Sequence, residues 1–259
     1  MTNGVHSPAN LGLAGKTILV TGGVRGVGAG IAQVLADLGA NPVVCARRPG
    51  DDGREFYPCD VRDSDAVAEM IAAIVAKHGT LDGVVNNAGG SPFALAADAS
   101  DNYSRKIIEL NLIAPLIVAR AAHQVMVNQP DGGSIVNVSS VSGHRPSPGT
   151  AAYGAAKAGM DNLTESLAVE WAPAVRVNSV ICGPVHTEQS HLHYGDDDGI
   201  AAVGATIPMG RLALPEDIGN AVAFFLSPMA SFITGSTVTV HGGGEKPAFL
   251  SAANADNKA

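Results

Sequence analysis

Apolar residues follow two periods along this chain. Short β-branched runs alternate with longer segments in which apolar residues recur every three or four positions. Runs of the first kind are typical of buried strands, and segments of the second kind are typical of the helices that cover them. The pattern predicts strands at 16–21, 42–46, 55–58, 81–85, 133–140, 175–181 and 236–240. It predicts helices at 31–38, 66–77, 103–127, 151–171 and from 215 onward, with Ser64 as the cap of the second and Thr150 as the cap of the fourth.

The alternation of strands and helices contains no internal repeat and no linker, which favours one doubly wound parallel α/β sheet. We expect a single domain over 13–245, preceded by a flexible arm at 1–12 and followed by a polar tail at 246–259. Residues 188–207 combine three consecutive acids, glycines and histidines without a clear period. Such a composition is typical of a mobile loop over a site.

Composition and charge narrow the choice of partner. Hydrophobic residues make up 46% of the chain and charged residues 15%, which indicates a large buried core. A net charge of −8 argues against nucleic acid or an anionic membrane as the main partner. No leader peptide or membrane-spanning run is recognisable, and the three cysteines lack metal-ligand spacing. We therefore expect a cytoplasmic protein that acts on a small molecule.

A glycine-spaced turn follows the first expected strand. Gly22, Gly26 and Gly28 stand between that strand and the first helix. Such a turn brings backbone N–H groups and the positive end of a helix up to a pyrophosphate. The flanking strand and helix strengthen an otherwise weak signal, so we expect a dinucleotide site here.

Arginines near the end of the second strand indicate which dinucleotide binds. Folds that bind NAD usually place an acid at this point to hold the ribose 2′-hydroxyl, whereas a basic residue accommodates a 2′-phosphate. Arg47 and Arg48 occupy this region, and Arg25 lies in the glycine turn. Arginine forks match phosphate geometry, so these residues favour NADP(H), with NAD(H) as the alternative.

Tyr153 and Lys157 stand four residues apart in an Ala/Gly-rich run that predicts the start of a helix. At that spacing the two side chains share one face of the helix. A phenol titrates near a pH of about 10, and a neighbouring ammonium favours the phenolate. The same pair also suits a solvated helix edge, so the pair alone does not define a site.

Asn111 breaks the apolar pattern of the longest expected helix, and Pro115 follows four residues later. Proline removes one backbone hydrogen bond of a helix. The combination indicates either a buried structural hydrogen bond or a kink that frees a carbonyl to hold water.

The ordered motifs resemble the short-chain dehydrogenase/reductase family across essentially the whole chain. They are Thr21-Gly-x-x-x-Gly26-x-Gly28, Asp60-Val61, Asn86-Asn-Ala-Gly89, Asn111, Ser140, Tyr153-x-x-x-Lys157, Gly183-x-x-x-Thr187, Gly210-Arg-x-x-x-Pro-Glu-Asp217 and Gly242–Gly244. The resemblance implies a Rossmann-type, seven-stranded parallel sheet with helices on both faces. It also implies a homo-oligomer, either a tetramer or a dimer.

The resemblance assigns a role to each of four residues. Tyr153 is implied to be the general acid of carbonyl reduction and the base of alcohol oxidation. Lys157 is implied to lower the pKa of Tyr153 and to bind the nicotinamide ribose. Ser140 would polarise the substrate oxygen, while its neighbour Ser139 should face the opposite side of the strand. Asn111 would position a relay water.

The same resemblance implies the cofactor contacts. Those to the pyrophosphate and 2′-phosphate are Gly22, Arg25, Gly26, Val27 and Gly28. Asp60 and Val61 are implied to contact adenine, and Asn87 and Gly89 to contact the adenosine ribose. Val185 and Thr187 are implied to contact the carboxamide. We expect the substrate pocket to include Ser142, His144, Leu192 and Tyr194, and to suit an apolar ketone such as a steroid, a 3-oxoacyl thioester or a polyketide.

Three departures from the family pattern stand out. Cys182 replaces the usual proline before Gly183, and His241 replaces the usual acid near the last strand. The helix between the second and third strands is missing, because fewer than ten residues separate Ala46 from the strand at 55–58. This short connection exposes the adenosine end of the site.

Alternatives from other functional classes are less favoured. A cofactor-binding regulator without turnover usually lacks the tyrosine or the lysine. Lyases and epimerases of nucleotide sugars usually carry a longer C-terminal domain, and enoyl reductases space the tyrosine and lysine more widely. No metal site is expected, because His186, His191, His193 and Asp196–Asp198 lie in a segment with poor ligand spacing.

Overall fold

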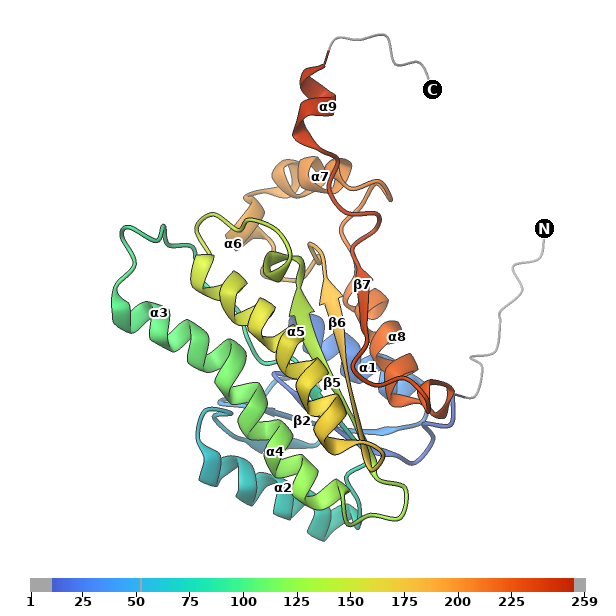
Figure 1. Ribbon diagram of the computed structural model, residues 1–259. Coiled ribbons are helices and arrows are strands. Elements are labelled where there is room, and N and C mark those ends of the chain that lie inside the picture. Colours follow the sequence, from blue (N-terminus) through green and yellow to red (C-terminus); the bar gives the residue numbers. More distant parts are fainter. Residues whose placement is uncertain (1–10, 52, 254–259) are drawn as a thin grey trace, which may run out of the picture.

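The protein forms a parallel sheet of seven strands with helices on both faces (Figure 1). The computed structural model describes residues 11–51 and 53–253. Residues 1–10 of the expected arm and 254–259 of the expected tail lie outside this described part.

Every predicted strand is present, with ends shifted by two residues at most. The strands are β1 (Thr17–Thr21), β2 (Asn41–Ala46), β3 (Phe56–Pro58), β4 (Gly83–Asn86), β5 (Gly133–Ser140), β6 (Val175–Cys182) and β7 (Thr237–Val240). Their order is β3-β2-β1-β4-β5-β6-β7, and every pair is parallel. The order in which strands are added to the sheet reverses between β1 and β4, which is where such sheets bind ligands.

The larger helices cover the sheet in two groups. One face carries α1 (Gly26–Asp37) and α8 (Pro215–Leu226), and the other carries α2 (Ser64–His78), α4 (Ala114–Met126) and α5 (Ala151–Trp171) (Figure 1). Shorter helices are α3 (Asp101–Ile108), α6 (His191–Tyr194), α7 (Asp197–Thr206) and α9 (Ala248–Ala252). Short helical turns are η1 (Glu109–Ile113), η2 (Val141–Gly143) and η3 (Pro228–Ala230).

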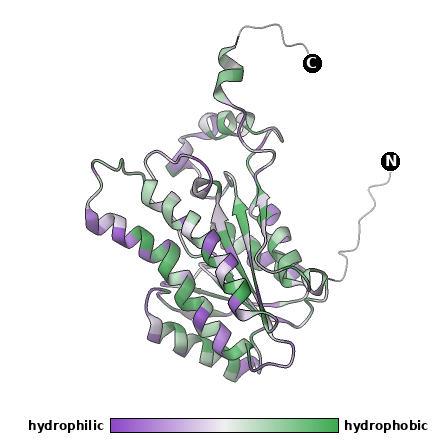
Figure 2. Ribbon diagram, in the orientation of Figure 1, coloured by the Kyte–Doolittle hydropathy of each residue, from purple (hydrophilic) through white to green (hydrophobic). Residues whose placement is uncertain are grey.

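Two apolar cores lie above and below the sheet. Leu19 packs under α2, α4 and α5, whereas its neighbours Ile18 and Val20 pack under α1 and α8. Successive residues of a strand point to opposite faces, so one unbroken apolar run serves both cores. Figure 2 shows hydrophilic and hydrophobic residues interleaved along the outer helices.

The helix expected over 103–127 is continuous but contains a π turn. The N–H of Ala114 donates to the carbonyl of Glu109, five residues earlier. Pro115 has no N–H to donate to the carbonyl of Asn111, so the regular pattern cannot continue there.

Two helix caps differ from the expectation, and two segments contain helices that the sequence did not predict. The cap of α2 is Asp63 rather than Ser64, since Asp63 Oδ1 accepts from the N–H groups of Asp65 and Ala66 at 3.0 and 3.1 Å. Thr150 precedes α5, but its hydroxyl bonds Ser147 and makes no cap bond. The segment 188–207, expected as a loop, contains α6 and α7, and the expected tail contains α9.

Candidate active site

The glycine turn between β1 and α1 forms a cradle without side chains. Gly22 and Gly26 have φ values of +65° and +53°, which favour glycine. A Cβ on Gly28 would lie 2.3 Å from the carbonyl of Gly22. Arg25 precedes α1, and its side chain makes no cap hydrogen bond. The first N–H groups of this helix have no partner within the helix and face the glycine turn. These features fit a pyrophosphate.

Hydrogen bonds from Thr21 lock the ends of β1 and β4 beside this cradle. The Thr21 hydroxyl accepts the N–H groups of Asn87 and Ala88, both at 3.0 Å, and donates to the carbonyl of Val85 at 3.2 Å. The Asn87 amide donates to the carbonyl of Thr21 at 3.0 Å. Asn87 therefore lies at the crevice where the strand order reverses.

The arginines expected at the 2′-position lie on adjoining segments. Arg25, Arg47 and Arg48 are all exposed. A Cβ on Gly50 would lie 3.0 Å from the carbonyl of Val24, so the segment that follows β2 rests against the glycine turn. The structure thus brings the two arginine-bearing segments together.

Asp60 has a partner that the sequence did not reveal. Arg62 binds its carboxylate through two side-chain contacts, Nε–Oδ1 at 2.9 Å and Nη2–Oδ2 at 2.6 Å. The hydrogen bond from Arg62 lowers the pKa of Asp60 to about 2. Asp60 is therefore a fixed carboxylate at the end of β3, next to the buried Val61.

Tyr153 and Ser140 lie together in the catalytic region. Burial raises the pKa of Tyr153 to about 12, and a hydrogen bond with Ser140 opposes this shift. The resemblance implies that Lys157 lowers this pKa, but burial has the larger effect here. Tyr153 is accordingly a neutral phenol near pH 7, which is the form that donates a proton.

Lys157 is held in place by the backbone of β5. Its ammonium donates to the carbonyl of Val138 at 2.7 Å and lies 5.6 Å from the centre of the Tyr153 ring. The residue is only 3% exposed, and burial lowers its pKa to about 8. The side chain is therefore fixed within reach of the phenol.

Asn111 fastens the loop after β4 to the π turn. Its amide donates to the carbonyls of Gly90 and Ile107 at 3.0 and 2.9 Å, and its carbonyl oxygen accepts the N–H of Gly90 at 2.8 Å. A Cβ on Gly89 would lie 2.6 Å from this oxygen. The first alternative left open by the sequence is thus seen, because the buried Asn111 side chain makes structural hydrogen bonds.

The segment after β6 returns to the glycine turn. A Cβ on Gly26 would lie 3.6 Å from the Thr187 methyl group. The N–H of Thr187 donates to Ser190 Oγ at 2.9 Å, and Val185 forms a parallel bridge with Ala213. The first contact places Thr187 at the glycine turn, and Val185 lies two residues before it on the same segment.

The expected substrate residues have different surroundings. The N–H of Ser142 donates to Ser140 Oγ at 3.2 Å, while His144 Nε2 lies 2.9 Å from Asp161 Oδ2. Leu192 is 67% exposed. Tyr194 lies close enough to Tyr153 to raise its pKa. Only Tyr194 and Ser142 are therefore tied directly to the catalytic residues.

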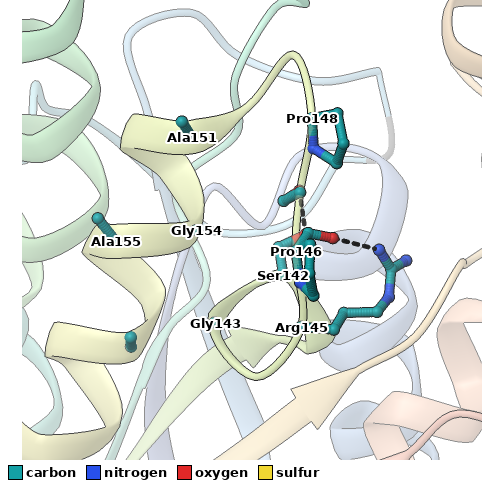
Figure 3. Close-up of a pocket in the computed structure, with 10 residues that line it drawn as sticks. Ser142, Gly143, Arg145, Pro146, Pro148, Ala151, Gly154 and Ala155 are labelled. Carbon is teal, nitrogen blue, oxygen red and sulfur yellow. Dashed lines mark hydrogen bonds between the residues drawn. The ribbon is translucent and has the colours of Figure 1, made fainter. Parts of the chain in front are cut away.

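A hollow of about 410 Å³ lies between the loop after β5 and α5 (Figure 3). It is lined by Ser142, Gly143, Arg145, Pro146, Ser147, Pro148, Ala151, Gly154, Ala155 and Ala158. Ala151, Ala155 and Ala158 share one side of α5, and helical spacing turns that side away from Tyr153. This hollow is therefore distinct from the catalytic face.

Asp161 belongs to the site but was not predicted. It lies one helical turn beyond Lys157, and its charge acts on the pKa of that residue. Its signal in the sequence was the four-residue spacing from Lys157, which puts both side chains on one face of α5.

The described part of the chain contains neither a cluster suited to a metal ion nor a helix suited to cross a membrane. Within 11–51 and 53–253, histidine, cysteine and acidic side chains form no cluster of three suited to a metal ion. Among the helices of the same residues, none has the length and apolar character needed to cross a membrane.

Comparisons with known proteins agree with this geometry. A family model described as Enoyl-(Acyl carrier protein) reductase matches residues 22–245. Human Dehydrogenase/reductase SDR family member 4 is 34% identical, over 89% of this chain and 88% of that protein. A 3-oxoacyl-(acyl-carrier-protein) reductase of Vibrio cholerae is 35% identical, over 90% of this chain and 98% of that protein.

Solved structures give the same answer. Ligand-free aldohexose dehydrogenase of Thermoplasma acidophilum has a TM-score of 0.85 and 32% identity, with 90% of this chain and 94% of that chain covered. The chain belongs to the short-chain dehydrogenase/reductase family, whose members are oxidoreductases that bind NAD(P)(H).

Proposed function

We propose that this protein reduces a ketone to a secondary alcohol with NADPH, and that it catalyses the reverse reaction with NADP⁺. The observation that carries this proposal is the arrangement of Tyr153, Ser140 and Lys157. A neutral phenol lies beside Ser140, whose hydroxyl acts on its pKa, and a lysine fixed to the sheet lies one helical turn away. Together these residues can bind a carbonyl oxygen and supply its proton.

The reaction follows from these positions. The glycine turn would hold a dinucleotide, which when bound would supply hydride chemistry at the substrate carbon in either direction. Negative charge then develops on the substrate oxygen, where the hydroxyls of Ser140 and Tyr153 act as donors. Tyr153 transfers its proton to this oxygen, and the Lys157 ammonium stabilises the phenolate that remains. Asn111 holds the loop beside Gly90 in place, and its backbone carbonyl, to which Pro115 cannot donate, is the position we propose for a water on the route that returns the proton.

Electrostatics at the adenosine end supports NADP(H) over NAD(H). Arg25, Arg47 and Arg48 carry exposed guanidinium groups on segments that touch. An ionised Asp60 lies nearby, but Arg62 already binds its carboxylate. A 2′-phosphate would therefore meet net positive charge.

Exposed apolar side chains support an apolar substrate. Phe93, Leu192 and Met209 are 71%, 67% and 68% exposed, and they come from the segments that follow β4 and β6. A Cβ on Gly149 would collide with the Phe93 ring, so Phe93 lies against the loop that leads to Tyr153. A steroid, 3-oxoacyl or polyketide ketone fits this chemistry, and we propose a cytoplasmic homo-oligomer as the working form.

The test compares the parent protein with Tyr153→Phe and uses NADPH and NADH with a panel of cyclic and acyl ketones. We expect reduction by the parent with a preference for NADPH. Loss of the phenol proton should lower kcat by about 10²-fold or more, because positioned acid catalysis contributes this much. Tyr103→Phe is the matched control, since Tyr103 bonds the carbonyl of Pro92 instead.

Each outcome separates the proposal from an alternative. Equal rates for Tyr153→Phe and the parent would contradict the mechanism, and a preference for NADH would contradict the arginine argument. Cofactor binding without turnover on any ketone would favour a regulator. The family description and a similar dienoyl-CoA reductase of Bacillus subtilis justify adding an unsaturated acyl thioester to the panel. Faster reduction of its double bond would favour enoyl reduction.

A further inference from the structure

Polar side chains line the face of α5 that packs on the sheet. Lys157, Asp161 and Thr164 follow one another at helical spacing, and all three are buried. Thr164 accepts a hydrogen bond from the Asn137 amide at 2.8 Å, and Lys157 donates to the carbonyl of Val138 at 2.7 Å. Asp161 lies between them and carries the negative charge of this row.

The Asp161 carboxylate has partners from three other elements. It accepts hydrogen bonds from Ser139 of β5 and Ser179 of β6, each at 2.9 Å. His144, which follows η2, lies at the same distance from Oδ2. Asp161 is 7% exposed, and a buried carboxylate is tolerated only where such partners replace water.

The position of Ser139 connects this carboxylate with catalysis. Ser139 lies between Val138, whose carbonyl binds Lys157, and Ser140, which bonds Tyr153. The contact with Asp161 therefore fixes Ser139, which links Val138, the partner of Lys157, to Ser140, the neighbour of Tyr153. The contact with His144 fixes the chain just beyond Ser140 to the same carboxylate.

We propose that Asp161 is a positioning residue of the reductase, holding the end of β5 and the following loop so that Ser140, Tyr153 and Lys157 stay in register. This role rests on the proposed function. Displacing a reacting group by about 1 Å can cost about 10²-fold in rate, so a clamp at this point affects catalysis directly.

The charge of Asp161 has a second effect, on Lys157. Burial lowers the pKa of Lys157, and the neighbouring groups that oppose burial are Cys182 of β6 and Asp161. The groups that face this region are Tyr153 and Asp161 on α5, Cys182 on β6 and His144 after η2. Removing the charge of Asp161 should therefore lower the pKa of Lys157 further.

The central variant is Asp161→Asn, which keeps the shape of the side chain and removes its charge. We expect kcat to fall by roughly 10- to 100-fold with KM little changed, since the Asp161 carboxylate is engaged by Ser139, Ser179 and His144. The alkaline limb of the kcat profile should move to lower pH. Thr164→Val is the matched control, because it removes a buried hydrogen bond from the same face of α5 without changing charge.

A second measurement is independent of activity. The pKa of Lys157 is about 8 when folded and 10.5 as its ordinary value, so the unfolded chain binds the extra proton between these two values. The contribution of Lys157 to stability should therefore rise with pH from about 8 to 10.5, against the fall that the buried thiols of Cys45, Cys59 and Cys182 cause from about pH 9 upward in parent and variants alike. In Asp161→Asn this rise should begin at lower pH, and in Thr164→Val it should keep its position.

The outcomes separate the two proposals. If the parent is active and Asp161→Asn matches Thr164→Val in kcat and in both pH profiles, Asp161 is merely structural and the inference is overturned. If no ketone is reduced, the proposed function fails, while the unfolding curves still test the effect on Lys157. Should Asp161→Asn fail to fold, Ser139→Ala removes the same link from the strand side. A kcat unchanged in Ser139→Ala would then overturn the clamp.

Discussion

At the scale of single residues, Lys157 combines a catalytic position with an unfavourable environment. Its pKa falls from 10.5 to about 8 because of burial, so the folded state holds the ammonium at a cost near pH 7. A shift of this size corresponds to about 3 kcal/mol. The bond to Val138 offsets part of this cost, by about 1 kcal/mol.

Lys157→Met should consequently be inactive but more stable than the parent at pH 7, by about 2 kcal/mol. The folded pKa of Lys157 is depressed, so its cost is full below about pH 8 and disappears above 10.5. The advantage of the methionine variant should shrink over the same window. Urea unfolding at pH 7 and pH 10 measures both effects.

Lys106→Met, on the exposed side of α3, is the control and should change stability by less than about 0.5 kcal/mol at either pH. A Lys157→Met protein less stable than the parent at pH 7 would contradict the burial argument.

Residue spacing predicted part of this site. The four-residue step from Tyr153 to Lys157 gave a shared helix face, and a chain-wide resemblance assigned the roles. The carbonyl of Val138 carries no signal in the sequence, because any residue could supply it. The bond between Arg62 and Asp60 depends on the turn after β3, which no period describes.

At the scale of elements, the closest helix pair is α1 and α8. A Cβ on Gly30 would lie 2.2 Å from Pro215 Cβ and 3.0 Å from the Pro215 carbonyl carbon. Pro215 begins α8, so its backbone cannot move without moving that helix. Gly30 therefore sets the distance between the two helices.

Gly30→Ala should destabilise the protein by about 1–3 kcal/mol, although alanine is the better helix former. Gly159→Ala is the matched control, since its Cβ would meet only the flexible end of Leu112, at 3.1 Å. Chemical unfolding should show little loss for this second variant. Equal losses of unfolding free energy in both variants would mean that Pro215 moves aside as easily as Leu112, which would contradict the prediction.

The sequence predicted the elements better than their ends. Apolar runs gave every strand, because the central strands are buried on both faces and consist mostly of apolar residues, although β5 and β6 also bury polar side chains such as Asn137 and Ser179. The cap of α2 was assigned to Ser64 where Asp63 accepts the hydrogen bonds. The helices α6 and α7 were missed, because their exposed residues leave no apolar period to detect.

At the scale of the whole molecule, the open edge of the sheet at β7 is bordered by exposed apolar residues. Phe232, Val169 and Met229 are 102%, 84% and 66% exposed. A Cβ on Gly235 would touch Ala168, so the segment before β7 adjoins the outer end of α5. Apolar residues beside an unpaired edge are typical of an interface, which supports the proposed homo-oligomer.

Phe232→Arg should reduce the assembly to a smaller species in sedimentation velocity, because the charge would be buried without a partner. Phe249→Arg changes another exposed phenylalanine, on α9, and should leave the assembly intact. A monomeric parent would contradict the oligomer, and an unaffected Phe232→Arg protein would place the interface elsewhere.

The sequence predicted the parallel sheet and its place in the family, since both depend on the order of motifs. It did not predict which apolar residues stay exposed. Phe232 and Phe225 are the same residue type, yet one is fully exposed and the other 1% exposed. Only the assembled fold distinguishes them.

The π turn at 109–113 also acts as a phase shift. One extra residue in a helix rotates everything after it by about 100° relative to what precedes it. Before the turn, α3 packs against α5, and after it α4 packs against α2, β4 and β5. One continuous helix, from α3 through α4, can thus pack against α5 on one side and against α2 and the sheet on another. Deleting one residue here would point the apolar stripe of α4 away from the sheet.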